Sequence, residues 1–153
     1  MTSSLLLNAP EIELLRALLT FGARFLVIGG HAVIFHGYLR PAKDLDLFVD
    51  AAADNPGKMI SALTSVSVHH PDMTAARLAK PNQQIRIDGM YNAELLTSVA
   101  GLSFELAYRD RVVSQEATLQ VPVVSREDLL RSKRKLGRPQ DLEDVAALLK
   151  VGA

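Results

Sequence analysis

Two aspartates, Asp44 and Asp46, stand one residue apart in the alternating segment KDLDLFVD. Because side chains alternate on a strand, both carboxylates would project from one face, with Cα atoms about 6.5 to 7 Å apart. Two carboxylates that share a site repel each other unless a cation compensates them, and Mg²⁺ or Mn²⁺ with oxygen ligands is the usual solution. The spacing therefore permits a divalent-cation site, and a solvated strand end is the alternative interpretation.

A third acid on a neighbouring strand would allow a two-metal site. The best candidate is Asp88, because it lies on the polar side of a second alternating segment, QQIRIDGM. The pattern alone makes Asp44, Asp46 and Asp88 the candidate ligands of such a site.

A glycine pair, Gly29 and Gly30, closes the apolar segment RFLVIGG shortly before the acids. A strand that ends in glycines and leads into a helix presents backbone N–H groups that no Cβ obstructs, and such groups favour phosphate oxygens. Metal ions that face bound phosphates can catalyse in-line displacement at a nucleotide phosphorus, because one ion assists the attacking oxygen and the other the leaving group. His31, the next residue, could bind a phosphate or base, or could cap or pack the helix start.

Hydrophobic periodicity places these residues on alternating helices and strands. Asn8, Pro10 and Glu11 have the form of a capped helix start, and Gly22 ends that helix. The sequence then predicts a buried strand in RFLVIGG, a two-turn helix in HAVIFHG, the strand KDLDLFVD and a loop in AAADNPG. The glycine pair is thus expected at a strand-to-helix turn, and the aspartates on the following strand.

The middle of the chain continues the alternation. We predict a helix over Lys58–Val66, a weaker strand in VSVHHPD, the strand QQIRIDGM and a helix over Glu94–Val99. The last strand candidates are LSFELAYRDRVV and ATLQVPVVS, and Pro122 favours an edge or terminal position for the second of them.

Two helices are predicted at the C-terminal end. Ser125 and Asp128 resemble a capping box that opens REDLLRSKRKL, Gly137 ends this helix, and Pro139 starts the last one, QDLEDVAALLK. The whole pattern predicts one α/β (α+β) domain over residues 1–153, in which helices flank a mixed sheet and the C-terminal segment is helical.

Composition excludes several classes of protein. Lys and Arg number 17 and Asp and Glu also number 17, so no whole-molecule field draws the chain onto nucleic acid or an anionic membrane. The absence of Cys excludes disulfides and thiolate metal sites and suits a reducing compartment. The three leucines near the N-terminus are too short a run for a signal sequence or membrane span. We therefore expect a cytoplasmic protein without a membrane partner.

The order of these motifs resembles the DNA polymerase β-like nucleotidyltransferase superfamily, in which a glycine followed by glycine or serine precedes D-x-D and a later strand with a third acid. The closer likeness is to the minimal bacterial nucleotidyltransferases of the abortive-infection and toxin–antitoxin toxin type. Their pattern is a glycine pair, a small helix, a glycine and an arginine four residues before D-x-D. The matching residues here are Gly29, Gly30, Gly37, Arg40, Asp44 and Asp46.

The later part of the chain resembles the same group. RIDGM is similar to its third-acid strand, GLSFELA to the segment after it, and VPVVSREDLLRSKRKLGRPQDLEDVAALL to its end, a lysine helix followed by G-R-P-x-D-x-x-D. The likeness extends from Phe25 to Leu149.

The resemblance implies a role for each matching residue. Asp44 and Asp46 would bind catalytic Mg²⁺ or Mn²⁺, and Asp88 would complete the triad and activate the acceptor hydroxyl. Gly29 and Gly30 would hold the triphosphate.

The resemblance also implies roles around the C-terminal helices. Lys133 matches a catalytic lysine near the nucleotide phosphates, and Asp141 and Asp144 match acids of the final helix, of which Asp141 is expected at the nucleotide. Arg40 would either contact phosphate or lock the loop before the strand.

The function that the resemblance implies is transfer of NMP from ATP or another NTP to an acceptor hydroxyl, with release of pyrophosphate. The acceptor would be tRNA or other RNA, a protein or a small molecule, and a toxin would have an antitoxin partner. The alternative is a catalytically inactive nucleotide- or partner-binding module of the same fold. Two departures favour this alternative, since many superfamily members have Ser at position 30 and the closer group often has Thr at position 42, where this chain has Gly30 and Ala42.

One dense basic cluster stands out late in the chain. Its members are Arg131, Lys133, Arg134, Lys135 and Arg138. The cluster is either a solvated helix face or a surface that contacts nucleic acid.

Overall fold

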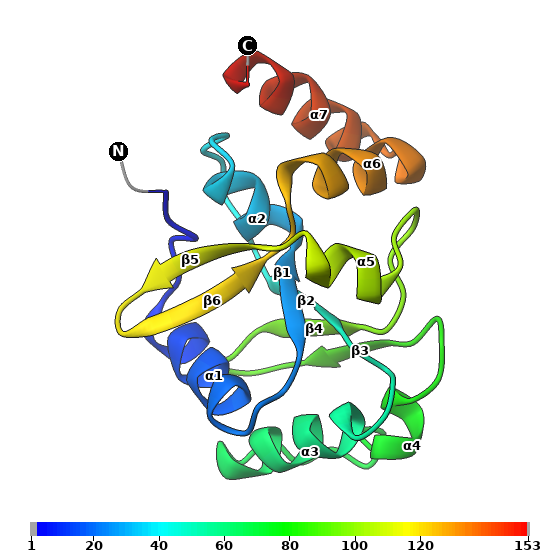
Figure 1. Ribbon diagram of the computed structural model, residues 1–153. Coiled ribbons are helices and arrows are strands. Elements are labelled where there is room, and N and C mark those ends of the chain that lie inside the picture. Colours follow the sequence, from blue (N-terminus) through cyan, green and yellow to red (C-terminus); the bar gives the residue numbers. More distant parts are fainter. Residues whose placement is uncertain (1–2, 153) are drawn as a thin grey trace.

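A computed structural model describes residues 3–152, in which one mixed sheet lies between two groups of helices (Figure 1). The strands are β1 (Phe25–Ile28), β2 (Leu45–Val49), β3 (Gln84–Ile87), β4 (Ala93–Leu96), β5 (Val112–Glu116) and β6 (Leu119–Val123). The helices are α1 (Ala9–Thr20), α2 (Gly29–Phe35), α3 (Asn55–Ser65), α4 (Ala75–Leu78), α5 (Phe104–Arg109), α6 (Arg126–Leu136) and α7 (Pro139–Val151). The predicted mixed α/β fold with a helical C-terminal segment is confirmed.

The sheet has the strand order β3-β4-β2-β1-β6-β5. Antiparallel hairpins form its two ends, β3 with β4 and β5 with β6. In the centre, β2 runs antiparallel to β1 and parallel to β4. This topology places β2, which carries Asp46, between β4 and β1, and β1 leads directly into the glycine pair at the start of α2.

Both faces of the central strand are covered. Leu45, Leu47 and Val49 are fully buried on one face of β2. On the opposite face, Phe48 packs edge to face against Phe104 of α5, with ring centroids 5.2 Å apart. Figure 1 shows α1, α3 and α4 below the sheet, and α2, α5, α6 and α7 above it. A strand covered in this way is held rigidly, and so is the position of any polar side chain on it.

The predicted helix starts at Asn8 and Ser125 are confirmed. Asn8 Oδ1 accepts a hydrogen bond from the Glu11 backbone N–H at 2.9 Å, and Glu11 Oε1 accepts one from the Asn8 N–H at 2.8 Å. Ser125 Oγ accepts from the Asp128 N–H at 3.1 Å, and α6 ends at Gly137, whose φ is +63°. These caps fix where α1 and α6 begin, and hence how their buried faces meet the sheet.

The strand predicted in VSVHHPD is wrong, because the chain turns there. Ser67 has a φ of +62°, and the Val68 N–H donates back to the Leu63 carbonyl at 2.9 Å, which closes the end of α3. Helix α3 also starts earlier than predicted, at Asn55, whose side chain binds the backbone of Arg24 and Asp50.

The strand predicted in LSFELAYRDRVV is wrong in its first part. Ser103 Oγ accepts a hydrogen bond from the Leu106 N–H and caps α5, and only the end of the segment belongs to β5. Pro122 occupies the next-to-last position of β6, which lies between β1 and β5, so it is near the end of its strand but the strand is not an edge strand.

The helix predicted over Glu94–Val99 is also wrong, since its first part is strand β4. Gly89 and Asn92 both have positive φ and turn the chain back after β3. Strand β4 then pairs with β3 on one side and β2 on the other, and this ladder overrides the helical propensity of the sequence AELL. Glu94 therefore lies on the sheet, where it becomes part of the candidate site.

Among the described helices, none combines the length and the apolar character needed to cross a membrane.

Candidate active site

Asp46 lies at the centre of the candidate site. It pairs in register with Ile28 of β1 and with Glu94 of β4. Its Oδ1 atom is buried and has no hydrogen-bond partner within residues 3–152. Burial, followed by the negative charges of Glu94 and Asp44, raises the pKa of Asp46 from 3.8 to about 6. The protein therefore holds a carboxylate whose charge is poorly compensated by its surroundings.

Glu94 is the acid that the sequence interpretation missed. Paired residues of neighbouring strands point to the same face, so Glu94 and Asp46 share one face of the sheet. Ala93 and Leu95 face the opposite side and are buried. The burial of AELL has a period of two in the structure, but the sequence itself does not alternate there and predicts a helix. The Gln84 side-chain amide donates to Glu94 Oε1 from β3.

Asp44 precedes β2 and is held by Arg86 of β3. The guanidinium donates from Nη1 to Asp44 Oδ2 at 3.1 Å and from Nη2 to Asp44 Oδ1 at 3.3 Å. Its Nε donates to Asp88 Oδ1 at 2.8 Å.

The structure therefore joins Asp88 to Asp44 through Arg86 and does not place Asp88 beside Asp46. Asp88 follows the end of the edge strand β3, and its side chain is 81% exposed. It borders a different hollow, together with His69 and His70. The position next to Asp46 belongs to Glu94, because the hairpin that follows Asp88 brings β4, not β3, against β2.

The first glycine of the pair lies against Asp46, and the second lies against Ala42. Gly29 has a φ of +67°, and a Cβ at this position would collide with the carboxylate of Asp46. A Cβ at Gly30 would lie 2.9 Å from the Cβ of Ala42. Glycine is thus required at position 29 by both the backbone conformation and the close approach of Asp46. The Cβ of Ala42 thus occupies the space next to Gly30 that a side chain at position 30 would need.

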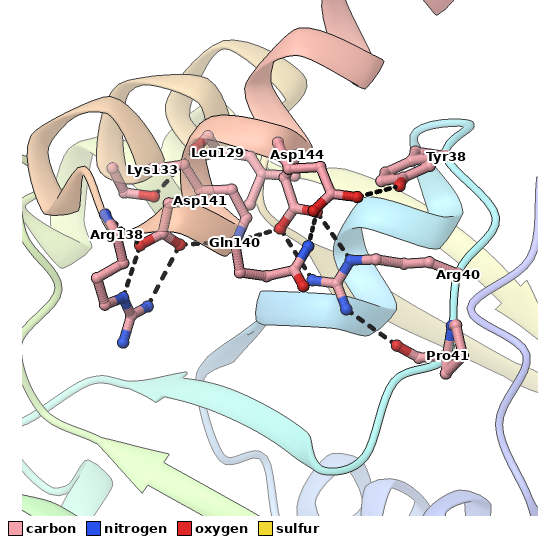
Figure 2. Close-up of polar contacts among 11 residues, drawn as sticks. Tyr38, Arg40, Pro41, Leu129, Lys133, Arg138, Gln140, Asp141 and Asp144 are labelled. Atoms are coloured by element: carbon pink, nitrogen blue, oxygen red, sulfur yellow. Dashed lines mark hydrogen bonds and ion pairs between the residues drawn. The ribbon is translucent and has the colours of Figure 1, made fainter.

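Lys133 and the acids of α7 form a buried ionic network (Figure 2). Lys133 Nζ lies 3.2 Å from Asp141 Oδ1 and 2.9 Å from Asp144 Oδ2, and all three side chains are buried. Arg138 Nε donates to Asp141 Oδ2 at 2.6 Å. Burial alone would raise the pKa of Asp141, but its bonds to Arg138 and Lys133 outweigh burial and lower it. Lys133 and Asp141 form an ion pair, so each charge is compensated by the other.

Arg40 locks the loop before β2 onto α7. Its Nε and Nη2 donate to the two carboxylate oxygens of Asp144 at 2.8 and 2.9 Å, and its Nη1 donates to the Pro41 carbonyl at 2.9 Å (Figure 2). Of the two roles expected for Arg40, the structure shows the loop contact. Bidentate pairing of this kind fixes both position and orientation.

His31 is turned away from the glycines and toward the N-terminal segment. The ring is buried, with Nδ1 at 2.7 Å from the Leu5 carbonyl oxygen and Nε2 at 3.2 Å from Glu11 Oε2. Burial would lower the pKa of His31, but its contacts with Glu11 and Leu5 outweigh burial and raise it. This geometry matches the packing alternative for His31.

Two hollows meet at Asp46 and Arg138. One, of about 250 Å³, has Glu94 and Lys133 at its polar end and apolar side chains such as Leu96 and Leu129 elsewhere. The other, of about 730 Å³, is bordered by Gly30, Arg40 and Asp44, among others. Together they form a cleft with carboxylates at its middle, and the volumes are of the order that small-molecule ligands occupy.

The donor set suits a hard divalent cation. Asp44, Asp46 and Glu94 supply carboxylate oxygens, which Mg²⁺ and Mn²⁺ prefer, and Asp46 Oδ1 has no partner within the described chain. In the side-chain conformations of residues 3–152, no three acids or histidines are grouped closely enough to hold a metal ion. Arg86 binds Asp44 and Gln84 binds Glu94, so both acids already have side-chain partners.

The basic cluster on α6 and after it is divided in two. Lys133 faces the buried network, whereas Arg131, Arg134 and Lys135 line an outer hollow of about 530 Å³. Arg131 pairs with Asp128 at 2.6 Å. The outer part of the cluster is separate from the cleft that contains Asp46.

No protein-family model matches the chain, and no curated protein matches it. The fold and the site therefore define the class of protein only as a mixed α/β protein with a carboxylate cluster beside a strand-to-helix glycine turn. The resemblance to nucleotidyltransferases therefore rests on the sequence motifs described above.

Proposed function

We propose that the protein is a metal-dependent nucleotidyltransferase that transfers NMP from an NTP to an acceptor hydroxyl. The observation that carries the proposal is the placement of Asp46. Asp46 Oδ1 is buried and has no hydrogen-bond partner within residues 3–152, and Oδ2 of the same carboxylate lies against Gly29. Asp46 also shares a sheet face with Glu94 and stands two residues after Asp44. A carboxylate kept in such a setting is costly unless a cation or proton neutralises it.

In this proposal the carboxylates of Asp44, Asp46 and Glu94 would hold Mg²⁺ or Mn²⁺. A bound divalent ion supplies neutralisation of the phosphate charge and activation of the attacking oxygen. Glu94 takes the role that the resemblance assigned to Asp88 and accepts the proton of the acceptor hydroxyl. A bond forms between the acceptor oxygen and the α-phosphorus, and the bond from that phosphorus to pyrophosphate breaks.

The remaining residues position the nucleotide. The backbone N–H groups at Gly29 and Gly30 would face phosphate oxygens. Arg138 borders both hollows, and its side chain is 67% exposed, so it can turn toward phosphates in either. Lys133 contributes by holding α6 and α7 together beneath the cleft, through Asp141 and Asp144.

For the acceptor we propose RNA, with tRNA as the first candidate, and a toxin role that would require an antitoxin partner. The basic side chains of Arg131, Arg134 and Lys135 on the outer face of α6 support this acceptor class, because they can contact phosphates outside the catalytic cleft. If label is transferred but no RNA is labelled, the acceptor hydroxyl belongs to a protein or a small molecule.

The test is incubation of the purified protein with each NTP labelled at the α-phosphate, Mg²⁺ or Mn²⁺, and total bacterial RNA or cell lysate. Asp46→Asn is the inactive variant. Asp54→Asn is the matched control, because this acid is 78% exposed and pairs with Lys58 of α3. Label transfer by the wild type and Asp54→Asn, but not by Asp46→Asn, is expected. Equal transfer by Asp46→Asn would overturn the proposal.

The second candidate is a nucleotide- or partner-binding module without turnover. It is favoured by the Arg86–Asp44 pair, because an arginine that compensates an acid makes a cation dispensable there. Metal-dependent NTP binding without label transfer to any fraction would select this candidate.

A further inference from the structure

Arg86 is fixed by three side chains at the rim of the acid cluster. Besides its two bonds to Asp44 and one to Asp88, its Nη2 donates to Asn92 Oδ1 at 2.5 Å. Asn92 in turn donates to the Lys43 carbonyl at 2.7 Å. The guanidinium is thus held from β3, from the β3–β4 turn and from the segment before β2.

Both oxygens of Asp44 accept hydrogen bonds from this one guanidinium. Asp46 has no such arginine, and its Oδ1 is unpartnered within residues 3–152. The two aspartates of D-x-D therefore differ, since one is neutralised by a side chain and the other is not. A divalent cation at Asp44 would meet a fixed positive charge at hydrogen-bond distance from its ligand.

We propose that Arg86 is a positioning residue that competes with the divalent cation for Asp44. Cation binding at Asp44 displaces the guanidinium, which stays attached at Asp88 and Asn92. The inference rests on the proposed function, because it requires the acid cluster to bind metal. It also gives Asp88 a role that its exposed position allows, which is to hold Arg86 and not to ligate the ion.

The first test measures Mn²⁺ affinity from the electron paramagnetic resonance signal of free Mn²⁺. Arg86→Gln removes the competing charge and keeps a polar side chain, so it is expected to bind Mn²⁺ about tenfold more tightly or better than the wild type. Arg109→Gln is the matched control, because this exposed arginine pairs with Asp110 outside the cleft. Unchanged or weaker Mn²⁺ binding by Arg86→Gln would overturn the inference.

A second measurement follows Arg86 itself. Its guanidinium Nη–H resonances, which report the bonds to Asp44 and are assigned by their loss in Arg86→Gln, are expected to shift when Mg²⁺ is added to the wild type and to stay in place in Asp44→Asn. Resonances unaffected by saturating Mg²⁺ in the wild type contradict displacement. Because Arg86 is on the surface of an edge strand, its replacement leaves the buried core intact, and the melting temperature verifies this.

The outcomes separate this inference from the proposed function. Label transfer by the wild type combined with equal Mn²⁺ affinity in Arg86→Gln would overturn the role of Arg86 alone. Tighter Mn²⁺ binding by Arg86→Gln without label transfer by the wild type would overturn the enzyme and leave the role of Arg86. Absence of Mn²⁺ binding in both proteins would overturn both.

Discussion

Asp46 and Glu94 occupy paired positions on the parallel strands β2 and β4, so their carboxylates share one face of the sheet. After burial, the charge of Glu94 is the largest cause of the raised pKa of Asp46, which is about 6. Gly29 completes the arrangement from the start of α2, because only a residue without Cβ can lie against the Asp46 carboxylate. Three separate segments of the sequence thus bring a buried carboxylate next to a second negative charge.

Asp46→Asn is expected to raise the stability of the protein above pH 6. The folded state holds the proton of Asp46 more tightly than the unfolded chain, since its pKa is about 6 when folded and 3.8 in the reference state. Wild-type stability therefore falls as the pH rises from about 4 to about 6 and stays lowered above that range. At pH 8 the variant is expected to gain up to about 3 kcal/mol in urea unfolding.

The gain must disappear below about pH 4, where Asp46 is protonated in both folded and unfolded states. Asp54→Asn, at an exposed position, is expected to follow the wild type at every pH. If the unfolding free energy of Asp46→Asn ran parallel to that of the wild type between pH 4 and pH 8, the raised pKa would be refuted. Addition of Mg²⁺ at pH 8 is expected to raise the melting temperature of the wild type and not that of Asp46→Asn.

Replacing Glu94 is expected to matter more for label transfer than replacing Asp88. Glu94→Gln preserves the size of the side chain and its contact with Gln84, but it removes the charge beside Asp46. We expect a loss of about 100-fold or more in the rate of NMP transfer, the range typical of a general base. Asp88→Asn is expected to change the rate by only a few fold.

This pair of variants distinguishes the two candidates for the third acid. The measurement is the initial rate with labelled NTP, with Mn²⁺ affinity recorded for both variants. A large loss in Asp88→Asn together with wild-type activity in Glu94→Gln would restore the assignment that the sequence suggested.

Gly29→Ala is expected to destabilise the protein and to displace Asp46. The added Cβ would overlap the Asp46 carboxylate, and alanine is strained at a φ of +67°. We expect a loss of about 2 to 4 kcal/mol in urea unfolding. Gly57→Ala is the matched control, since a Cβ there meets nothing within 4 Å inside helix α3, and it is expected to be neutral or slightly stabilising. Equal stability of the two variants would show that Asp46 can move without cost.

The sequence was sufficient to predict the local features of this fold. The cap at Asn8, the strand-to-helix turn at Gly29 and the end of α6 at Gly137 each depend on interactions within a few residues. The position of Asp46 on β2 followed from simple alternation. Local rules therefore placed both the glycine pair and the central acid.

Features that depend on pairing between distant segments were not predicted. AELL has good helix formers, and only the ladders to β2 and β3 make it a strand, so Glu94 could not be assigned from its own neighbourhood. For the same reason Asp88 was chosen as the third acid. The alternation of QQIRIDGM continues through Asp88, but strand β3 ends at Ile87, and the sequence does not reveal that β3 is an edge strand separated from β2 by β4.

Lys133→Met is expected to cost about 3 to 5 kcal/mol of stability, because it leaves the buried Asp141 and Asp144 without their shared cation. The measurement is urea unfolding at pH 7. Lys150→Met, on the exposed side of α7, is the matched control and is expected to change stability by less than about 0.5 kcal/mol.

The pH dependence separates this ionic role from simple packing. Bonds to cationic partners outweigh burial and hold the pKa values of Asp141 and Asp144 below 3.8 in the folded protein. Their stabilisation is therefore present above about pH 4 and is lost as the pH falls through the lower, folded-state pKa values. The difference between the wild type and Lys133→Met should accordingly shrink in acid. A variant as stable as the wild type at pH 7 would mean that Arg40 and Arg138 satisfy both acids, and that Lys133 is free to serve a bound phosphate.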